Sequence, residues 1–156
     1  MLQIKSSVKL LFPLFLLVFI GLNAQKTSFI IKEGNSELQN KIGSFENQYL
    51  DGIVDNATTA DSKVLSSILD LSNLKIAPED KEPYLHLKFK KDKEQNVIIS
   101  SASWQVSFER IDDSTTKVSV KLWSIIPDEK SSKFLNVKKS VTSGRLEKEL
   151  KTFFEH

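Results

Sequence analysis

The chain contains no cysteine, so neither disulfide bonds nor thiol chemistry contributes to its fold or function. It has only two histidines, His86 and His156, and it lacks the clusters of His, Cys and acidic residues that typify metal sites. Its five glycines are isolated and match no phosphate-binding loop. These absences predict a protein without a metal or an organic cofactor, and they favour a non-enzymatic role.

The amino-terminal segment has the composition of a secretory signal peptide. Lys5 and Lys9 form a basic start, an uncharged apolar run follows, and Ala24 is a small residue of the type that signal peptidases favour. The apolar run is shorter than the ~20 residues that cross a bilayer, and it contains Pro13. We therefore expect cleavage of residues 1–24, no stable membrane span afterwards, and export of the remainder to the periplasm or the extracellular medium.

The remaining chain is formally neutral, because Lys5 and Lys9 account for the whole net charge of +2. The basic isoelectric point of the full sequence therefore gives no support to nucleic-acid binding. Residues 25–156 have the usual length of a single domain. We divide this exported domain into a helical half, residues 25–82, in which acids predominate, and a sheet half, residues 83–156, in which bases predominate.

Two neighbouring segments with alternating apolar and polar residues give the clearest structural prediction. Apolar side chains occupy every second position over most of residues 98–108, and the alternation resumes after a polar turn at residues 112–115. An antiparallel hairpin that places Trp104 opposite Leu122 also places Glu109 opposite Lys117. One register therefore satisfies both faces of the hairpin.

Three further strands are expected around this hairpin. Residues 27–32 form a short strand or an ordered arm that ends in a turn. Residues 84–90 alternate and face residues 98–102, and the lysine-rich residues 134–141 form an edge strand.

Helical spacing of apolar residues predicts helices over residues 36–49, 61–71 and 143–154, the last capped by Ser143. The predicted fold class is α+β, with an antiparallel three- to four-stranded meander sheet packed against two N-terminal helices and one C-terminal helix.

The outer face of the predicted sheet carries a set of candidate ligand-binding residues: Trp123, Lys121, Ser103, Gln105 and His86. An indole, lysines and hydroxyl groups together suit an anionic or sugar-like ligand, through stacking and hydrogen bonds. The favoured interpretation is nevertheless that a helix or residues 29–31 cover Trp123, because large exposed apolar groups are costly.

An enzymatic alternative rests on His86 and Ser101, which the predicted register places opposite each other. No third group is available to orient the histidine, and no glycine turn exposes the serine. Asp112 and Asp113 are adjacent residues of a turn, which is typical of turn chemistry rather than of an acid-base pair. A hydrolase using His86 and Ser101 is therefore kept only as an alternative.

We expect the protein to be an exported, non-enzymatic binding or accessory module whose partner is an unknown small molecule or an envelope protein. The main alternative is a carrier of small lipids or amphipathic ligands. Its cavity would lie between the sheet and the helices, lined by Leu85, Leu87, Trp104, Phe108, Leu150 and Phe153. A further alternative is an envelope assembly subunit that pairs through an edge strand.

Overall fold

The computed structural model describes residues 26–49, 54–55, 63–91 and 93–156 of the chain. The predicted signal peptide lies outside these residues, as do Gly52 at the expected end of the first helix and the expected loop at residues 56–61. No helix within the described ranges is long and apolar enough to span a membrane.

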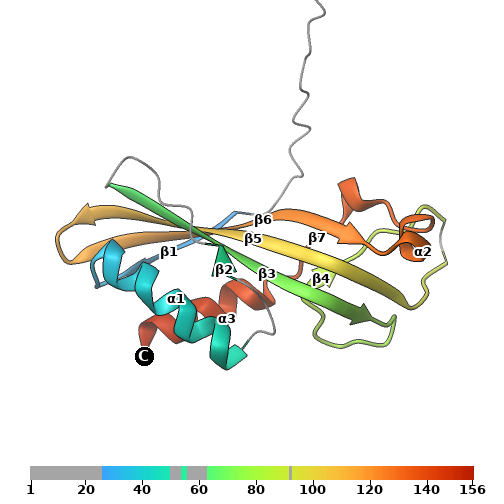
Figure 1. Ribbon diagram of the computed structural model, residues 1–156, viewed down its shortest axis with the longest axis horizontal. Coiled ribbons are helices and arrows are strands. Elements are labelled where there is room, and N and C mark those ends of the chain that lie inside the picture. The colour runs from blue at the N-terminus through green and yellow to red at the C-terminus, as the bar shows by residue number, and fades with distance from the viewer. Residues whose placement is uncertain (1–25, 50–53, 56–62, 92) are drawn as a thin grey trace, which may run out of the picture.

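A five-stranded antiparallel sheet with the strand order β1-β6-β5-β3-β2 forms the centre of the fold (Figure 1). Its strands are β1 (Thr27–Ile31), β2 (Val54–Asp55), β3 (Val64–Ile76), β5 (Val97–Asp112) and β6 (Thr115–Pro127). Helices α1 (Asn35–Tyr49) and α3 (Arg145–Glu155) both lie against the same face of this sheet (Figure 1). The smaller elements are β4 (Leu85–His86), helix α2 (Glu129–Ser132), a 3-10 turn (Val137–Lys139) and β7 (Val141–Thr142).

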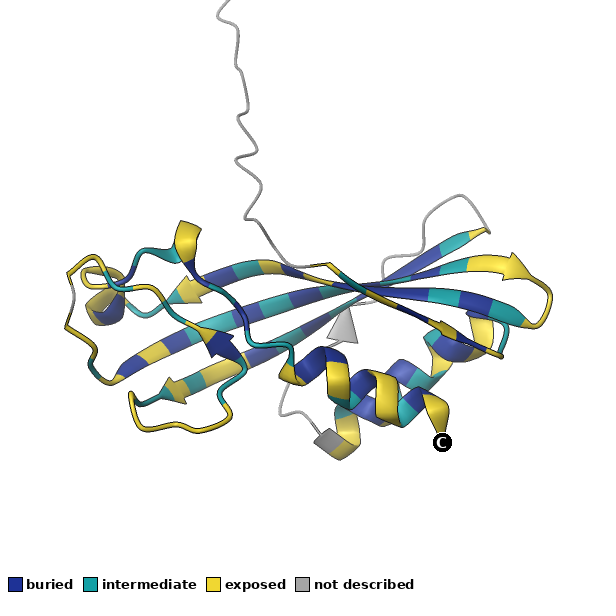
Figure 2. Cartoon of the chain, turned by 180° about the vertical axis from the view of Figure 1, so that it is seen from behind, coloured by how far each residue is buried: buried dark blue, intermediate teal, exposed yellow. Residues whose placement is uncertain are grey.

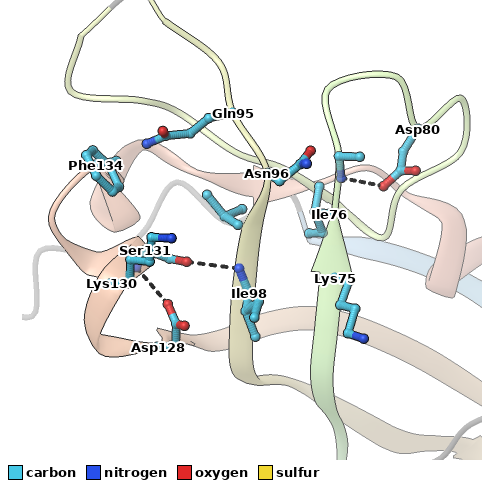
Figure 3. A pocket seen from close by; sticks show the side chains of 12 residues that line it. Lys75, Ile76, Asp80, Gln95, Asn96, Ile98, Asp128, Lys130, Ser131 and Phe134 are labelled. Carbon is cyan, nitrogen blue, oxygen red and sulfur yellow. Dashed lines mark hydrogen bonds between the residues drawn. The ribbon is translucent and has the colours of Figure 1, made fainter.

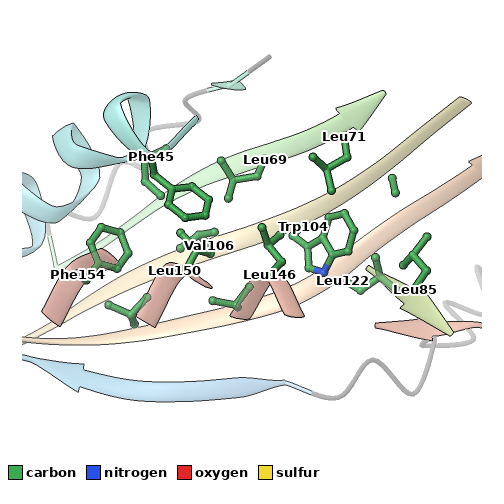
Figure 4. Packing of buried hydrophobic residues seen from close by; sticks show 14 of the residues in the cluster. Phe45, Leu69, Leu71, Leu85, Trp104, Val106, Leu122, Leu146, Leu150 and Phe154 are labelled. Atoms are coloured by element: carbon green, nitrogen blue, oxygen red, sulfur yellow. The ribbon is translucent and has the colours of Figure 1, made fainter. Parts of the chain in front are cut away.

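The face of the sheet beneath the helices is the hydrophobic core (Figures 2 and 4). Residues at alternate positions of β5 and β6 are at most 1% exposed: Trp104, Val106, Phe108, Val118, Val120 and Leu122. Aromatic rings pack between the sheet and α3: the ring centroids of Phe108 on β5 and Phe154 on α3 are 6.0 Å apart in an edge-on arrangement. Period-two burial of one face therefore accounts for the long strands.

The predicted hairpin register is confirmed. Trp104 pairs with Leu122 and Glu109 pairs with Lys117, whose Nζ lies 3.7 Å from Glu109 Oε2. The α+β class is confirmed as well, and so are the short strand that begins at Thr27 and the helix that begins near Asn35.

The helix predicted over residues 61–71 is wrong, because residues from Val64 onward form the strand β3. This strand pairs with β5 from Val64 opposite Glu109 to Ile76 opposite Val97. The apolar residues that suggested a helical stripe fit an alternating pattern equally well, and the long ladder with β5 decides between them. The division into a helical half and a sheet half is therefore wrong too, since β3 belongs to the central sheet.

The strands predicted over residues 84–90 and 134–141 are also wrong in extent and partner. Only Leu85–His86 is a strand in the first segment, and it pairs with Val141–Thr142 in a separate two-stranded sheet. Most of the second segment forms turns, including the 3-10 turn. The neighbour of β5 is β3, which fills the place that residues 84–90 were expected to take.

The C-terminal helix is confirmed, but its cap differs from the prediction. Gly144, and not Ser143, is the N-cap, and its φ of 86° lies in the left-handed region that glycine tolerates. The Ser143 hydroxyl still accepts a hydrogen bond from the backbone N–H of Arg145, at 3.2 Å.

Candidate functional site

We call the side of the central sheet that faces away from α1 and α3 the outer sheet face. Serines dominate it, and four of them lie side by side across four strands. In the strand register Ser66 pairs with Ser107, Ser107 with Ser119, and Ser119 with Ser28. The Oγ atoms of Ser28 and Ser119 are 2.9 Å apart. The outer sheet face is therefore polar, and its small side chains are rich in hydroxyl groups.

A carboxylate lies within this field of hydroxyl groups. Ser101 Oγ and Ser103 Oγ both donate hydrogen bonds to Asp70 Oδ1, at 2.7 and 3.2 Å. Ser124 Oγ lies 3.3 Å from Ser103 Oγ and extends the network onto β6. Both bonds to the carboxylate fall on one oxygen, so Asp70 keeps acceptor capacity on Oδ2. The serines therefore fix the carboxylate in one orientation at a partly buried position of the outer sheet face.

Trp123 lies on the same side of the sheet, next to this network. A β-bulge in β6 shifts the register so that Ser103 faces Ser124, with Trp123 as the extra residue. Leu122 and Ile125 on either side are buried in the core, so the two residues between them share the outer side. The indole is 52% exposed, so the expectation that a helix or residues 29–31 cover it is wrong.

Four of the five predicted site residues lie on the outer sheet face. Lys121 and Gln105 are direct partners in the register, and Gln105 lies two residues along β5 from Ser103. His86 is not with them. It belongs to β4 and lines a separate pocket of about 440 Å³ beside Gly144 and Arg145.

The register that supported a hydrolase is wrong. Ser101 pairs with Ser72 on β3 and with Ile126 on β6, whereas His86 pairs with Val141 in the small sheet. The Ser101 hydroxyl donates its hydrogen bond to Asp70 rather than to an imidazole. The geometry that would let His86 activate Ser101 is therefore absent from the described residues.

The residues named for a lipid carrier belong to the packed core. Leu85, Trp104, Phe108 and Leu150 are at most 1% exposed, and the Phe153 ring packs edge-on against Phe45 with centroids 5.4 Å apart. Leu85 and Leu87 line a pocket of about 220 Å³, whose other lining residues include Ile76 at the end of β3 and Pro78 just after it. The observed geometry therefore favours a surface site over a cavity beneath the helices.

Sequence reasoning missed Asp70, the residue that organises the network, and Ser124 beside it. Asp70 was not predicted to lie on the outer sheet face because its segment was interpreted as a helix. The available signal was the alternation of Leu69, Asp70, Leu71 and Ser72, which places the carboxylate opposite the core face of a strand.

No protein-family model matches the sequence, and no curated protein is significantly similar to it. Within the described ranges, no group of three or more His, Cys, Asp or Glu residues is arranged to hold a metal ion. The function is therefore argued from the geometry of the outer sheet face.

Proposed function

We propose that the protein is an exported, non-enzymatic binding module whose outer sheet face binds a saccharide or a similar polyhydroxylated ligand. One observation carries this proposal. The carboxylate of Asp70 is held by two serine hydroxyls on the same side of the sheet as the exposed indole of Trp123.

The two groups suit the two surfaces of a sugar ring. A pyranose presents an apolar face of C–H groups, which stacks on an indole, and a periphery of hydroxyl groups, which donate to a carboxylate. Serine hydroxyls and the amide of Gln105 both donate and accept, so they match hydroxyl groups in either orientation. The outer sheet face offers these groups from three adjacent strands without an intervening helix.

An exposed polar sheet face is by itself ordinary, and the apolar residues distinguish this one. Trp123 is 52% exposed and Ile126, which pairs with Ser101, is 55% exposed. A face that is only solvated has no use for two large apolar side chains around a carboxylate network. Their position beside Ser101 and Ser103 is what a ligand with both apolar and hydroxyl surfaces requires.

We expect Trp123→Ala to weaken binding of a soluble oligosaccharide about five- to thirtyfold, because stacking contributes on the order of 1–2 kcal/mol. A glycan array with the mature protein identifies the oligosaccharide, and isothermal titration calorimetry measures its Kd. Asp70→Asn is expected to weaken the same ligand, because a neutral amide accepts weaker hydrogen bonds than a carboxylate.

Ile111→Ala is the matched control, because Ile111 is an equally exposed apolar residue (56%) at the far end of the hairpin. Its Kd should equal that of the unmodified protein. Binding that survives Trp123→Ala unchanged, or a glycan array without any bound saccharide, would contradict the proposed function.

Export is the second part of the proposal and is tested independently of the ligand. We expect intact-mass spectrometry of the protein isolated from its own host to give the mass of residues 25–156, because cleavage follows Ala24. A mass that includes residues 1–24 would contradict export by a cleaved signal peptide.

A further inference from the structure

A second site lies at the end of the sheet, away from the Asp70 network. It is a pocket of about 710 Å³ between the last residues of β3, the first residues of β5 and the segment of α2 (Figure 3). This volume falls within the range of about 300–1,000 Å³ that is usual for small-molecule sites. Ile76 and Val97, which are partners in the register, together with Ile98 and Phe134, give it apolar walls.

Hydrogen bonds hold the walls of this pocket in place. Ser131 Oγ accepts the backbone N–H of Ile98 at 2.9 Å, and the backbone N–H of Asp128 donates to the Ile98 carbonyl at 3.0 Å. These two bonds tie α2 and its N-cap residue Asp128 to the beginning of β5. On the opposite side the backbone N–H of Ala77 donates to Asp80 Oδ2 at 2.8 Å, which fixes the turn after β3. The pocket is therefore formed before any ligand arrives.

The charges around the pocket are balanced and include both signs. Lys75 and Lys130 contribute ammonium groups, and Asp80 and Asp128 contribute carboxylates. Each carboxylate has one oxygen engaged by a backbone N–H, at Ala77 and Ser131 respectively. Hydrogen bonds from Ser131 lower the pKa of Asp128, so this group is ionised at neutral pH. A simple anion or cation would meet as many repelling as attracting groups here.

Two side-chain amides complete the lining. Gln95 and Asn96 come from the segment just before β5, and each offers a donor and an acceptor to the pocket (Figure 3). That combination matches the donor and acceptor of a peptide bond. The pocket thus presents both charges, amide partners and an apolar surface at Phe134 and Ile98.

We propose that this pocket binds a short peptide with free termini and a large apolar side chain. Its carboxylate meets the ammonium group of Lys130 on the α2 side of the pocket, and its ammonium meets the carboxylate of Asp80 on the β3 side (Figure 3). Its backbone amide lies against Gln95, and its apolar side chain packs on Phe134, toward which Gln95 extends (Figure 3). The site is independent of the saccharide site, so either proposal stands without the other.

The test is a nuclear magnetic resonance titration of the mature protein with the dipeptide leucyl-phenylalanine. We expect saturable shifts of the backbone amide signals of Ile76, Ile98 and Phe134, with a Kd on the order of 1 mM or below. N-acetylation or C-terminal amidation of the dipeptide removes one charge and should raise the Kd about tenfold. Glycyl-glycine, which lacks the apolar side chain, should bind at least about tenfold more weakly.

Matched variants assign the effect to the pocket. Lys130→Gln and Phe134→Ala should each raise the Kd for the dipeptide about tenfold. Lys133→Gln changes a lysine of the same segment that does not line the pocket, and should leave the Kd unchanged. The proposal is overturned by an absence of saturable shifts, by shifts outside the pocket only, or by equal affinity for the acetylated and free dipeptides.

Discussion

Replacing Trp104 with alanine is expected to lower the free energy of unfolding by about 3–5 kcal/mol, a large part of the stability of a domain of this size. Trp104 is 0% exposed at the centre of the inner face, where it pairs with Leu69 on one side and Leu122 on the other. Its Nε1–H also donates to Thr142 Oγ1 at 3.4 Å. Truncation therefore removes both a large buried surface and a partner of a buried hydroxyl. Urea denaturation followed by circular dichroism measures the loss.

The second tryptophan gives a control of the same residue type. Trp123 is 52% exposed on the outer sheet face, so Trp123→Ala is expected to change the free energy of unfolding by less than about 0.5 kcal/mol. Each variant keeps one tryptophan as a fluorescent reporter. Comparable losses for the two variants would mean that the inner and outer faces of β5 and β6 are wrongly assigned.

The hairpin of β5 and β6 was predictable from sequence because its determinants are local. Its two strands are joined by a tight turn, and matching the apolar face fixes the register, since a slip of one residue would expose Trp104 and its neighbours. The opposite-charge pair of Glu109 and Lys117 supports the same register from the other face. Nothing distant in the sequence is needed to specify this part of the fold.

The strand β3 was not predictable in the same way. Leu65, Leu69 and Leu71 lie on its core face, but Ile68 on the opposite face completes a helical spacing, and the buried Ser67 interrupts the apolar alternation. Local pattern therefore gives two answers. Pairing with β5, more than thirty residues away at most positions, selects the strand. Missing this strand also hid Asp70, and with it the centre of the candidate site.

Bulges limited the prediction of the outer sheet face. An irregularity between Ile99 and Ser101 turns Ile98 outward, to 39% exposure, and places Ile99 in the core. A second irregularity brings Ser124, rather than Trp123, opposite Ser103. Alternation assigns faces correctly only up to the first bulge, because each extra residue exchanges the two faces. Gln105 and Lys121 were correctly paired because the register between β5 and β6 has no irregularity from Trp104 to Arg110.

The buried carboxyl group of Glu147 opposes folding at neutral pH. Glu147 lies in the first turn of α3, is 2% exposed, and has no hydrogen-bond partner for Oε1 among the described residues. Burial raises its pKa above the ordinary value of 4.5, although a backbone N–H and the Thr142 hydroxyl, which donates to Oε2 at 3.0 Å, partly offset this effect. The folded state therefore binds a proton at this position more tightly than the unfolded chain does.

This imbalance fixes the sign of the pH dependence. The contribution of Glu147 to stability is most favourable below the pKa of the unfolded chain, and it is lost as the pH rises through the higher pKa of the folded state. The Oε1 atom of glutamine can still accept the hydrogen bond from Thr142, but glutamine carries no charge. Glu147→Gln should therefore remove the penalty at neutral pH and leave stability nearly unchanged in acid.

We expect Glu147→Gln to raise the free energy of unfolding at neutral pH by about 1–3 kcal/mol, because glutamine removes the negative charge whose desolvation opposes burial. Urea denaturation from about pH 4 to pH 8 should show the gain growing with pH. Glu149 lies two residues further along α3. Glu149→Gln should lower the free energy of unfolding at neutral pH, because Glu149 accepts hydrogen bonds from Arg145 Nε at 2.8 Å and from the Tyr84 hydroxyl at 3.1 Å. A destabilised Glu147→Gln variant, or a gain that does not vary with pH, would show that the buried carboxyl is not the source of the penalty.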